Sequence, residues 1–179
     1  APIPIDIKKD YDYENGGVMH DDAVEKIHSL VLKSLNHAVR MKSDIIVFPE
    51  LSLPRKYERI YKTLAGENNI LLIGGLEFKV NRNREVFNEI LISIPCNKWL
   101  SYSRKPYWSV SQFKIFPAAK EYNKLKSNNY NVVGGNELII FESDKWKNFA
   151  ILNCADFLSL KLKSKLQEKI QTLFVPSMN

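Results

Sequence analysis

Short apolar runs alternate with longer segments of helical periodicity along this chain of 179 residues. The runs at 44–50 (DIIVFPE) and 69–78 (NILLIGGLEF) are rich in branched aliphatic residues, and we expect both to be buried strands. Apolar residues recur every three to four positions over 21–42, which predicts an amphipathic helix, and a second helix is expected over 55–66. Strands that alternate with helices indicate an α/β domain in which the helices pack on a sheet.

The rest of the chain continues this mixture of patterns. Residues 11–20 are expected to be a polar loop, 106–136 mainly a loop with at most a short helix, and 158–170 a helix. The remaining expected strands lie at 2–7, 87–95, 99–105, 137–143, 148–153 and 172–177. Length and element order together favour a single α/β domain over 1–179, and they do not fit a sandwich of antiparallel strands alone.

The composition is typical of a soluble globular protein, with 45% hydrophobic and 26% charged residues. The longest apolar runs, such as ILLI at 70–73, are far too short to span a bilayer, and no secretory signal pattern opens the chain. The short apolar runs therefore give no reason to expect a membrane partner. The two cysteines make no disulfide framework, so we expect a cytoplasmic protein. Because the chain begins at Ala1 and stops at Asn179, directly after an expected strand, it is interpreted as a fragment of a longer domain or chain.

The net charge of +6 and the pI near 9.2 raise the question of nucleic-acid binding. The lysines are spread along the chain, with only mild density at 120–126 and 161–169, and no recognised nucleic-acid motif accompanies them. We therefore interpret the charge as solvated faces of helices and loops, and a nucleic-acid partner is not expected for this domain itself.

Two reactive side chains follow expected strands directly. Glu50 comes after DIIVFP and Cys154 after NFAILN, and catalytic groups collect where the strands of α/β sheets end. The three histidines, His20, His28 and His37, lie in a loop or in the first expected helix, where none is placed to act as a base. A cysteine–glutamate pair balanced by a lysine is the remaining chemistry, although a cysteine after an apolar run is more often a buried thiol.

Three separated stretches resemble motifs of the nitrilase superfamily, the carbon–nitrogen hydrolases, in the order that the family has them. DIIVFPELSLP (44–54) resembles the general-base motif, FKIFPAAKE (113–121) the lysine motif, and FAILNCADF (149–157) the nucleophile motif. The resemblance implies a catalytic triad of Glu50, Lys114 and Cys154. It also implies a supporting glutamate at Glu121.

The resemblance further implies an α-β-β-α sandwich, incomplete in this chain because the family's domain normally continues past the equivalent of Asn179. It implies a hydrolase that cleaves a small-molecule amide, nitrile or carbamoyl compound through a thioester, without a metal or organic cofactor. A backbone amide near Ala155 would help to bind the oxyanion, and Asp156 would orient the turn after the nucleophile. A homo-oligomer is also expected, since members of the family commonly assemble.

Some alternatives stay open at this point. Lys105 also follows an aromatic and basic stretch, but Lys114 is preferred because Pro117 and Glu121 follow it as the family pattern requires. In place of an enzyme, the chain could be a nitrilase-like binding or assembly module of a larger multidomain protein, possibly fused to a nucleic-acid-acting enzyme. An unrelated flavodoxin-like domain with Cys154 in its core is the third hypothesis, and it predicts no clustering of the three triad residues.

Overall fold

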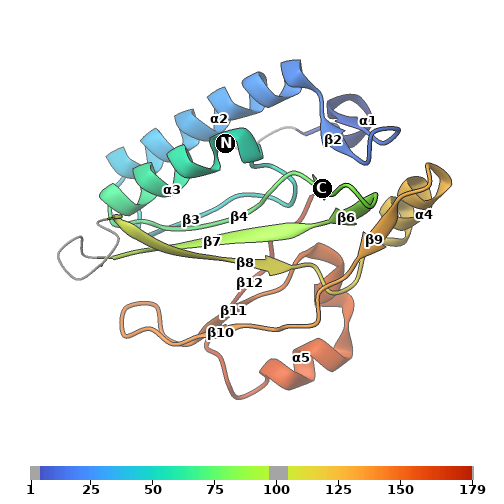
Figure 1. The fold of residues 1–179 in the computed structure, drawn as a ribbon. Coiled ribbons are helices and arrows are strands. Elements are labelled where there is room, and N and C mark those ends of the chain that lie inside the picture. Colours follow the sequence, from blue (N-terminus) through green and yellow to red (C-terminus); the bar gives the residue numbers. More distant parts are fainter. Residues whose placement is uncertain (1–4, 97–104, 179) are drawn as a thin grey trace.

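The computed structural model describes residues 5–96 and 105–178. Four layers are stacked in the order helices, sheet, sheet, helix (Figure 1). Helices α2 (Asp21–Arg40) and α3 (Glu58–Glu67) cover the outer face of a four-stranded sheet, and α5 (Leu160–Leu166) covers the outer face of a three-stranded sheet. The α-β-β-α sandwich expected from the sequence is therefore confirmed.

The four-stranded sheet has the order β3-β4-β7-β8. Its strands are β3 (Ile45–Val47), β4 (Leu71–Gly75), β7 (Glu89–Pro95) and β8 (Tyr107–Phe113). Strand β3 runs parallel to β4, β4 antiparallel to β7, and β7 antiparallel to β8. Consequently β3, β4 and β8 all point the same way, and their carboxyl ends lie at one end of the sheet.

The second sheet has the order β10-β11-β12, with β10 antiparallel and β12 parallel to the central strand. These strands are β10 (Ile140–Phe141), β11 (Phe149–Ile151) and β12 (Thr172–Phe174). Ala150 faces outward and packs with Leu162 and Leu166 of α5, because side chains alternate across a strand.

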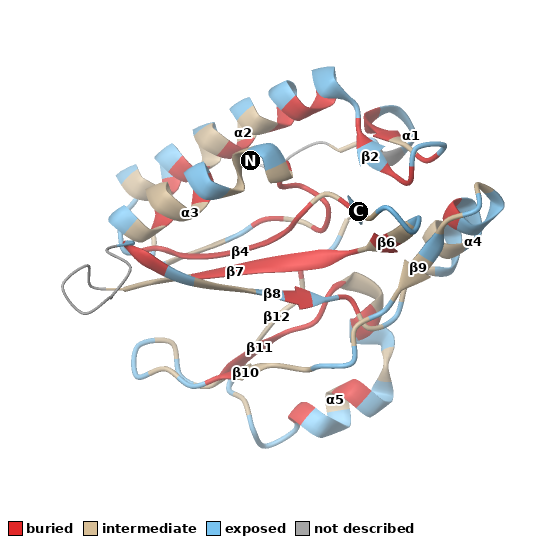
Figure 2. Cartoon of the chain, in the orientation of Figure 1, coloured by how far each residue is buried: buried red, intermediate tan, exposed pale blue. Residues whose placement is uncertain are grey.

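The core between the two sheets explains why β4 and β7 are apolar on both faces. Leu71, Ile73, Ile90 and Ile92 pack against the inner face of the second sheet, while their neighbours Leu72 and Leu91 pack toward α2 and α3. Figure 2 shows β4 as buried throughout and β7 as buried except at its end, whereas the helices are buried on one side only. Each fully buried aliphatic side chain of this kind contributes about 1.5–3 kcal/mol to folding.

Helix α2 begins and ends close to where its sequence predicts. It starts after His20 with two acidic residues in its first turn, which favours helix formation through the helix dipole. Its buried stripe repeats at helical spacing and consists of Ala23, Val24, Ile27, Val31, Leu35 and Ala38. The helix ends at Arg40, and Lys42 then takes a left-handed backbone conformation with φ of 51°.

The short helix allowed for in 106–136 is confirmed as α4 (Ala119–Ser127), but the expectation that the rest of this region is loop is wrong, because it contains β8 and β9 (Asn131–Val133). Strand β8 pairs with β7 along its whole length, from Glu89 opposite Phe113 to Pro95 opposite Tyr107. Its sequence has no apolar run because it is the edge strand, and several of its side chains stay accessible. The strand expected at 99–105 falls almost entirely outside the described residues.

The start of the chain also differs from the sequence prediction. The short helix α1 (Ile7–Asp10) begins at the last residue of the strand expected over 2–7, with the Asp6 side chain accepting from the Lys8 amide. Residues 2–4 of that expected strand lie outside the described residues. The expected loop at 11–20 contains a two-stranded hairpin, β1 (Tyr11–Asp12) and β2 (Val18–Met19). Two short strands, β5 (Lys79–Val80) and β6 (Glu85–Phe87), join β9 in a third small sheet. None of the helices in the described part of the chain is long and apolar enough to cross a membrane.

Candidate active site

Three chain segments meet where the strands of the two sheets end. Glu50 lies just beyond β3 and Lys114 directly after β8, and these strands point the same way within one sheet. Cys154 follows β11 of the facing sheet and begins the 3-10 helix η2 (Cys154–Leu158). The topology therefore brings a carboxylate, an ammonium group and a thiol from distant parts of the sequence to one place.

Glu50 and Lys114 form a buried ion pair. Lys114 Nζ lies 2.6 Å from Glu50 Oε1, and the side chain of each residue is only 2% exposed. Glu121, on α4, is the second partner of the ammonium group, with its Oε2 3.0 Å from Nζ. A buried charge pair is retained at a net benefit only when such extra contacts satisfy it, so Lys114 is fixed between two carboxylates.

The two carboxylates and the lysine shift one another's protonation equilibria. Burial alone would lower the pKa of Lys114, but the negative charges of Glu50 and Glu121 outweigh it and raise the pKa above its ordinary value. Burial, followed by the charge of Glu50, raises the pKa of Glu121, and Lys114 opposes that shift. The single positive charge of Lys114 therefore lies beside two carboxylates, whose combined negative charge it does not fully balance.

Cys154 is half-buried, and the charge of the Glu50 carboxylate acts on its thiol. Burial is the largest cause that raises the pKa of this thiol, and the negative charge of Glu50 raises it further. Lys114 and a backbone hydrogen bond with Met178 act in the opposite direction. The resting pair is thus a neutral thiol beside a carboxylate, which is the arrangement a general base requires.

The backbone of the Cys154 turn is held from two sides. Its amide donates to the Pro176 carbonyl at 3.0 Å, and its φ of 45° is in the left-handed region that non-glycine residues rarely adopt. Asp156 is fully buried, and its carboxylate accepts from the backbone amides of Ile115 and Phe116 at 3.1 and 2.7 Å. Because these two residues follow Lys114 directly, Asp156 fixes the cysteine turn to the lysine segment. Ala155 lies between Cys154 and Asp156 in the first turn of η2.

Gly75 permits the close approach that positions Glu50. A Cβ atom on this residue would lie 2.5 Å from Glu50 Cα and 2.4 Å from the Leu51 amide nitrogen. Leu51 has a left-handed φ of 56°, and its carbonyl accepts from the buried Tyr11 hydroxyl. The loop that carries Glu50 is therefore packed directly on the backbone of β4.

Solved structures of known enzymes share this arrangement of layers. No protein-family model matches the sequence, and the curated proteins give no significant match. An amidase from Nesterenkonia sp. superposes with a TM-score of 0.62 at 13% identity, over 86% of this chain and 59% of its own. A cysteine-to-serine variant of the Nesterenkonia AN1 amidase, described as from the nitrilase superfamily, gives a TM-score of 0.63 at 12% identity, over 86% and 60%.

The chain has the nitrilase-superfamily fold. A glutamine-dependent NAD+ synthetase from Acinetobacter baumannii also matches, with a TM-score of 0.58 at 16% identity, over 87% of this chain and 30% of that one. The chain thus spans about three fifths of the amidase and less than a third of the synthetase. The match to this fold contradicts the flavodoxin-like hypothesis, which also predicted no clustering of the triad side chains.

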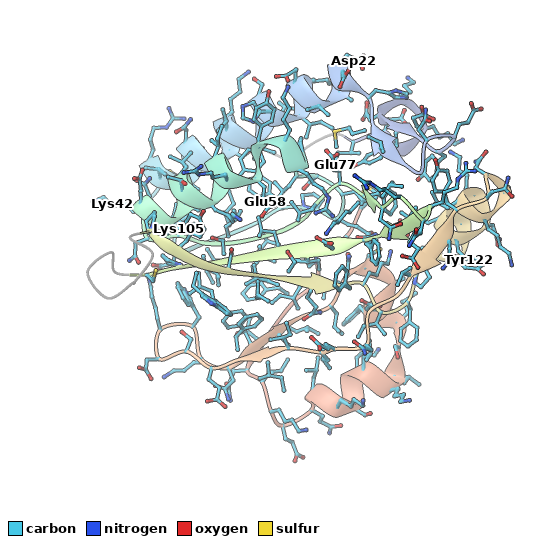
Figure 3. The ribbon with its side chains drawn as sticks, in the orientation of Figure 1. Asp22, Lys42, Glu58, Glu77, Lys105 and Tyr122 are labelled. Atoms are coloured by element: carbon cyan, nitrogen blue, oxygen red, sulfur yellow. The ribbon has the colours of Figure 1, made fainter. Side chains whose placement is uncertain are left out.

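Within this fold, the two lysines considered from the sequence lie far apart. Lys105 precedes β8 and Lys114 follows it, so Pro106 and the seven residues of the strand separate them. At a rise of about 3.3 Å per residue, that places the two backbones roughly 30 Å apart. Figure 3 labels Lys105 at one end of the sheet and Tyr122, the neighbour of Glu121 on α4, at the other. Lys114 contacts Glu50, as the motif comparison predicts for the catalytic lysine.

Two buried asparagines of this site were missed from the sequence. Asn88 Nδ2 donates to Glu50 Oε1 at 2.9 Å, and Asn153 Nδ2 donates to Asn88 Oδ1 at 3.0 Å. Both residues interrupt apolar stretches, in VFNEI and AILNC, and a polar residue at such a position must be hydrogen-bonded or functional. That interruption is the signal that could have identified them.

The site offers proton transfer, a nucleophile and a fixed cation. Among residues 5–96 and 105–178, no group of three or more histidine, cysteine, aspartate or glutamate side chains is arranged to hold a metal ion. His28, which the sequence placed on a helix, stacks on Tyr57 at 3.6 Å between ring centroids and shares a hydrogen bond with Tyr61.

Proposed function

We propose that this chain carries the catalytic centre of a carbon–nitrogen hydrolase that cleaves an amide, nitrile or carbamoyl bond outside peptides. The observation that carries the proposal is the convergence of Cys154, Glu50 and Lys114, in which a half-buried thiol lies within reach of the charge of a carboxylate that is itself paired with an ammonium group. These are the groups that covalent acyl transfer needs: a nucleophile, a base and a fixed positive charge.

In the proposed first step, Glu50 takes the Sγ proton of Cys154 as the sulfur attacks the carbonyl carbon of an amide. The S–C bond forms while the carbonyl π electrons move to oxygen, and the resulting oxyanion is stabilised by the Lys114 ammonium and a backbone amide near Ala155. Because Glu121 also holds Lys114, the cation is positioned before the substrate arrives and needs no reorganisation during the reaction.

In the second step the tetrahedral intermediate collapses and the C–N bond breaks. Glu50 gives its proton to the leaving nitrogen, so ammonia or an amine departs and a thioester remains on Cys154. Glu50 then takes a proton from water, the water oxygen attacks the thioester, and the C–S bond breaks as the thiol regains its proton. One residue thus acts as base, then acid, in each half of the reaction.

The test is ammonia or amine release from a panel of small amides, nitriles and carbamoyl compounds. We expect turnover of at least one class, and complete loss of it in Cys154→Ala. Cys96→Ala is the matched control, since Cys96 is the other free cysteine and lies at the end of β7, away from the triad. Full turnover in Cys154→Ala would refute the proposal.

The amidases of this fold suggest the substrate class but not the substrate. We propose a small-molecule substrate, a cytoplasmic setting and a homo-oligomeric assembly, with no cofactor in the reaction.

A second candidate function is a nitrilase-like binding or assembly module within a larger multidomain protein, for example one fused to a nucleic-acid-acting enzyme. The match to only 30% of the NAD+ synthetase chain favours this candidate, because it shows the same fold within a much longer chain. Thiol reactivity separates the two candidates. A catalytic Cys154 is expected to give a specific acyl adduct with amide or ester probes, whereas a binding module requires none.

A further inference from the structure

The amides of Asn88 and Asn153 form a buried bridge between the two sheets. Asn88 lies at the start of β7 in the four-stranded sheet, and Asn153 lies between β11 and Cys154 in the facing sheet. They are 4% and 1% exposed. A chain of hydrogen bonds therefore runs from the residue next to the nucleophile, through Asn88, to the Glu50 carboxylate.

The direction of these hydrogen bonds is fixed by the Glu50 carboxylate. An ionised carboxylate can only accept, so Asn88 must present its NH2 group to Glu50 and its carbonyl oxygen to Asn153. Asn153 must in turn donate through its own NH2 group. Rotating either side-chain amide so that its oxygen and NH2 group exchange places would bring two acceptor oxygens together, so each amide holds one orientation.

The bridge also determines which oxygen of Glu50 is occupied. Lys114 and Asn88 both donate to Oε1, at 2.6 and 2.9 Å. Neither of these two groups donates to Oε2, and the charge of the carboxylate acts on the Cys154 thiol.

The bridge is a costly way to join two sheets. Asn153 Oδ1 is buried and has no hydrogen-bond partner among the residues that the structure describes. An unsatisfied buried acceptor opposes folding. The retained amide is explained if its NH2 group has a task at the site.

We propose that Asn88 and Asn153 act as a positioning pair that holds the Glu50 carboxylate at the Cys154 thiol. The inference rests on the proposed function, since it takes Glu50 as the base that serves Cys154. Asn88 fixes the rotation of the carboxylate, and Asn153 couples that rotation to the residue that precedes the nucleophile. Neither amide touches the reacting atoms.

Gln112 provides a matched control. It is also a buried amide that joins the two sheets, because its Nε2 donates to the Ile151 carbonyl at 2.9 Å and its Oε1 accepts from the Ile139 amide at 3.3 Å. It makes no hydrogen bond to Glu50 or Cys154. Replacing it by leucine removes an inter-sheet amide without removing a contact of the base.

The experiment measures alkylation of Cys154 by iodoacetamide against pH, read by peptide mass spectrometry with Cys96 as the internal reference. Asn88→Leu and Asn153→Leu should each shift the midpoint to lower pH, because a carboxylate that drifts away no longer disfavours the thiolate. Glu50→Gln should shift it in the same direction, and Asn153→Leu should add little to that shift. Gln112→Leu should leave the midpoint unchanged.

Turnover gives a second readout, with kcat reduced by about 10- to 100-fold in the asparagine variants and KM little changed, as expected for misplacement of a base. If Asn88→Leu fails to fold, Asn153→Leu alone decides, and urea unfolding confirms that it folds, since this change removes the unpaired Asn153 Oδ1 and leaves Asn88 Oδ1 unpaired in its place. A wild-type midpoint in folded Asn153→Leu, with Glu50→Gln shifted, would overturn the positioning role while leaving the proposed function standing. An unshifted midpoint in Glu50→Gln itself would overturn both.

Discussion

Glu50→Gln separates the roles that the structure gives to this one side chain. Glutamine has nearly the same shape, and its carbonyl oxygen can still accept from Lys114 and Asn88 in place of Oε1. What changes is the charge and the ability to take a proton. The variant should therefore fold, but it should lose the base and the anion beside Cys154 together.

The expected loss of stability is modest for a buried ion pair. Removing one partner from such a pair typically costs about 3–5 kcal/mol, because a buried charge is left unpaired. Here Glu121 stays 3.0 Å from Lys114 Nζ, so the ammonium group keeps a counter-charge. We therefore expect a loss of about 1–3 kcal/mol in the free energy of unfolding, the usual range for a weakened buried hydrogen bond.

The effect on chemistry should be much larger. A positioned general base contributes about 10²- to 10⁴-fold to rate, and kcat/KM should fall by that factor in the variant. Alkylation of Cys154 should respond in the opposite sense. With the negative neighbour removed, the pKa of the thiol falls toward its ordinary value, so iodoacetamide reacts at lower pH than it does with the unaltered chain.

Glu89→Gln is the matched control for these measurements. Glu89 is also a buried carboxylate in an ion pair, with Arg55 Nη1 2.9 Å from its Oε2, but it does not pair with Lys114. This variant should lose stability while leaving the alkylation midpoint of Cys154 in place. The reasoning is refuted if Glu50→Gln keeps full turnover, or if its alkylation midpoint stays where Glu89→Gln has it.

Three further outcomes follow from the packing and charge of the site. Asp156→Asn should lower the free energy of unfolding, measured in urea, by about 1.5–3 kcal/mol. The charged carboxylate accepts from two backbone amides, whereas the neutral asparagine side chain has one oxygen and can accept from only one of them. An unchanged unfolding transition would contradict this. Gly75→Ala should lower the free energy of unfolding by about 1–3 kcal/mol through overpacking, and it should also reduce turnover, since the added Cβ would displace the backbone at Glu50. A fully active variant would show that the close contact between Gly75 and the Glu50 backbone is not needed. Because the pKa of Glu121 is raised, the folded state holds the proton of this carboxyl more tightly than the unfolded chain does. The protonated carboxyl therefore contributes to the free energy of unfolding below the ordinary glutamate pKa, and this contribution is lost as pH rises through the pKa of the folded state. Glu121→Gln should consequently gain stability relative to the unaltered chain as pH rises above the ordinary glutamate pKa, and a difference that stays constant with pH would refute the assigned shift.

The sequence predicted the elements whose pattern is set by burial. Helix α2 has six buried positions at helical spacing, and β4 is buried on both faces, so both are visible as apolar patterns. Strand β8 was missed because it is an edge strand, where pairing with β7 rather than an apolar run determines the conformation. Pairing partners distant in sequence leave no local pattern.

The site was predictable only in part for a similar reason. Glu50 and Cys154 stand at strand ends and Lys114 lies in a recognisable motif, so their convergence was expected from the resemblance. Asn88 and Asn153 belong to no motif used in that comparison. Their role depends on a hydrogen bond between two sheets, which only the three-dimensional structure shows.

The central claim is that Cys154 is a nucleophile served by Glu50, and an acyl adduct on the intact chain tests it most directly. The chain would be incubated with small amides, whose leaving nitrogen needs the proton that Glu50 supplies, then quenched in acid and digested, and the Cys154 and Cys96 peptides would be compared by mass spectrometry. The account predicts an acyl group on Cys154 alone, which disappears with time as the thioester hydrolyses and is absent in Glu50→Gln. Equal labelling of both cysteines, or an adduct on Cys154 that forms as readily without Glu50, would contradict it.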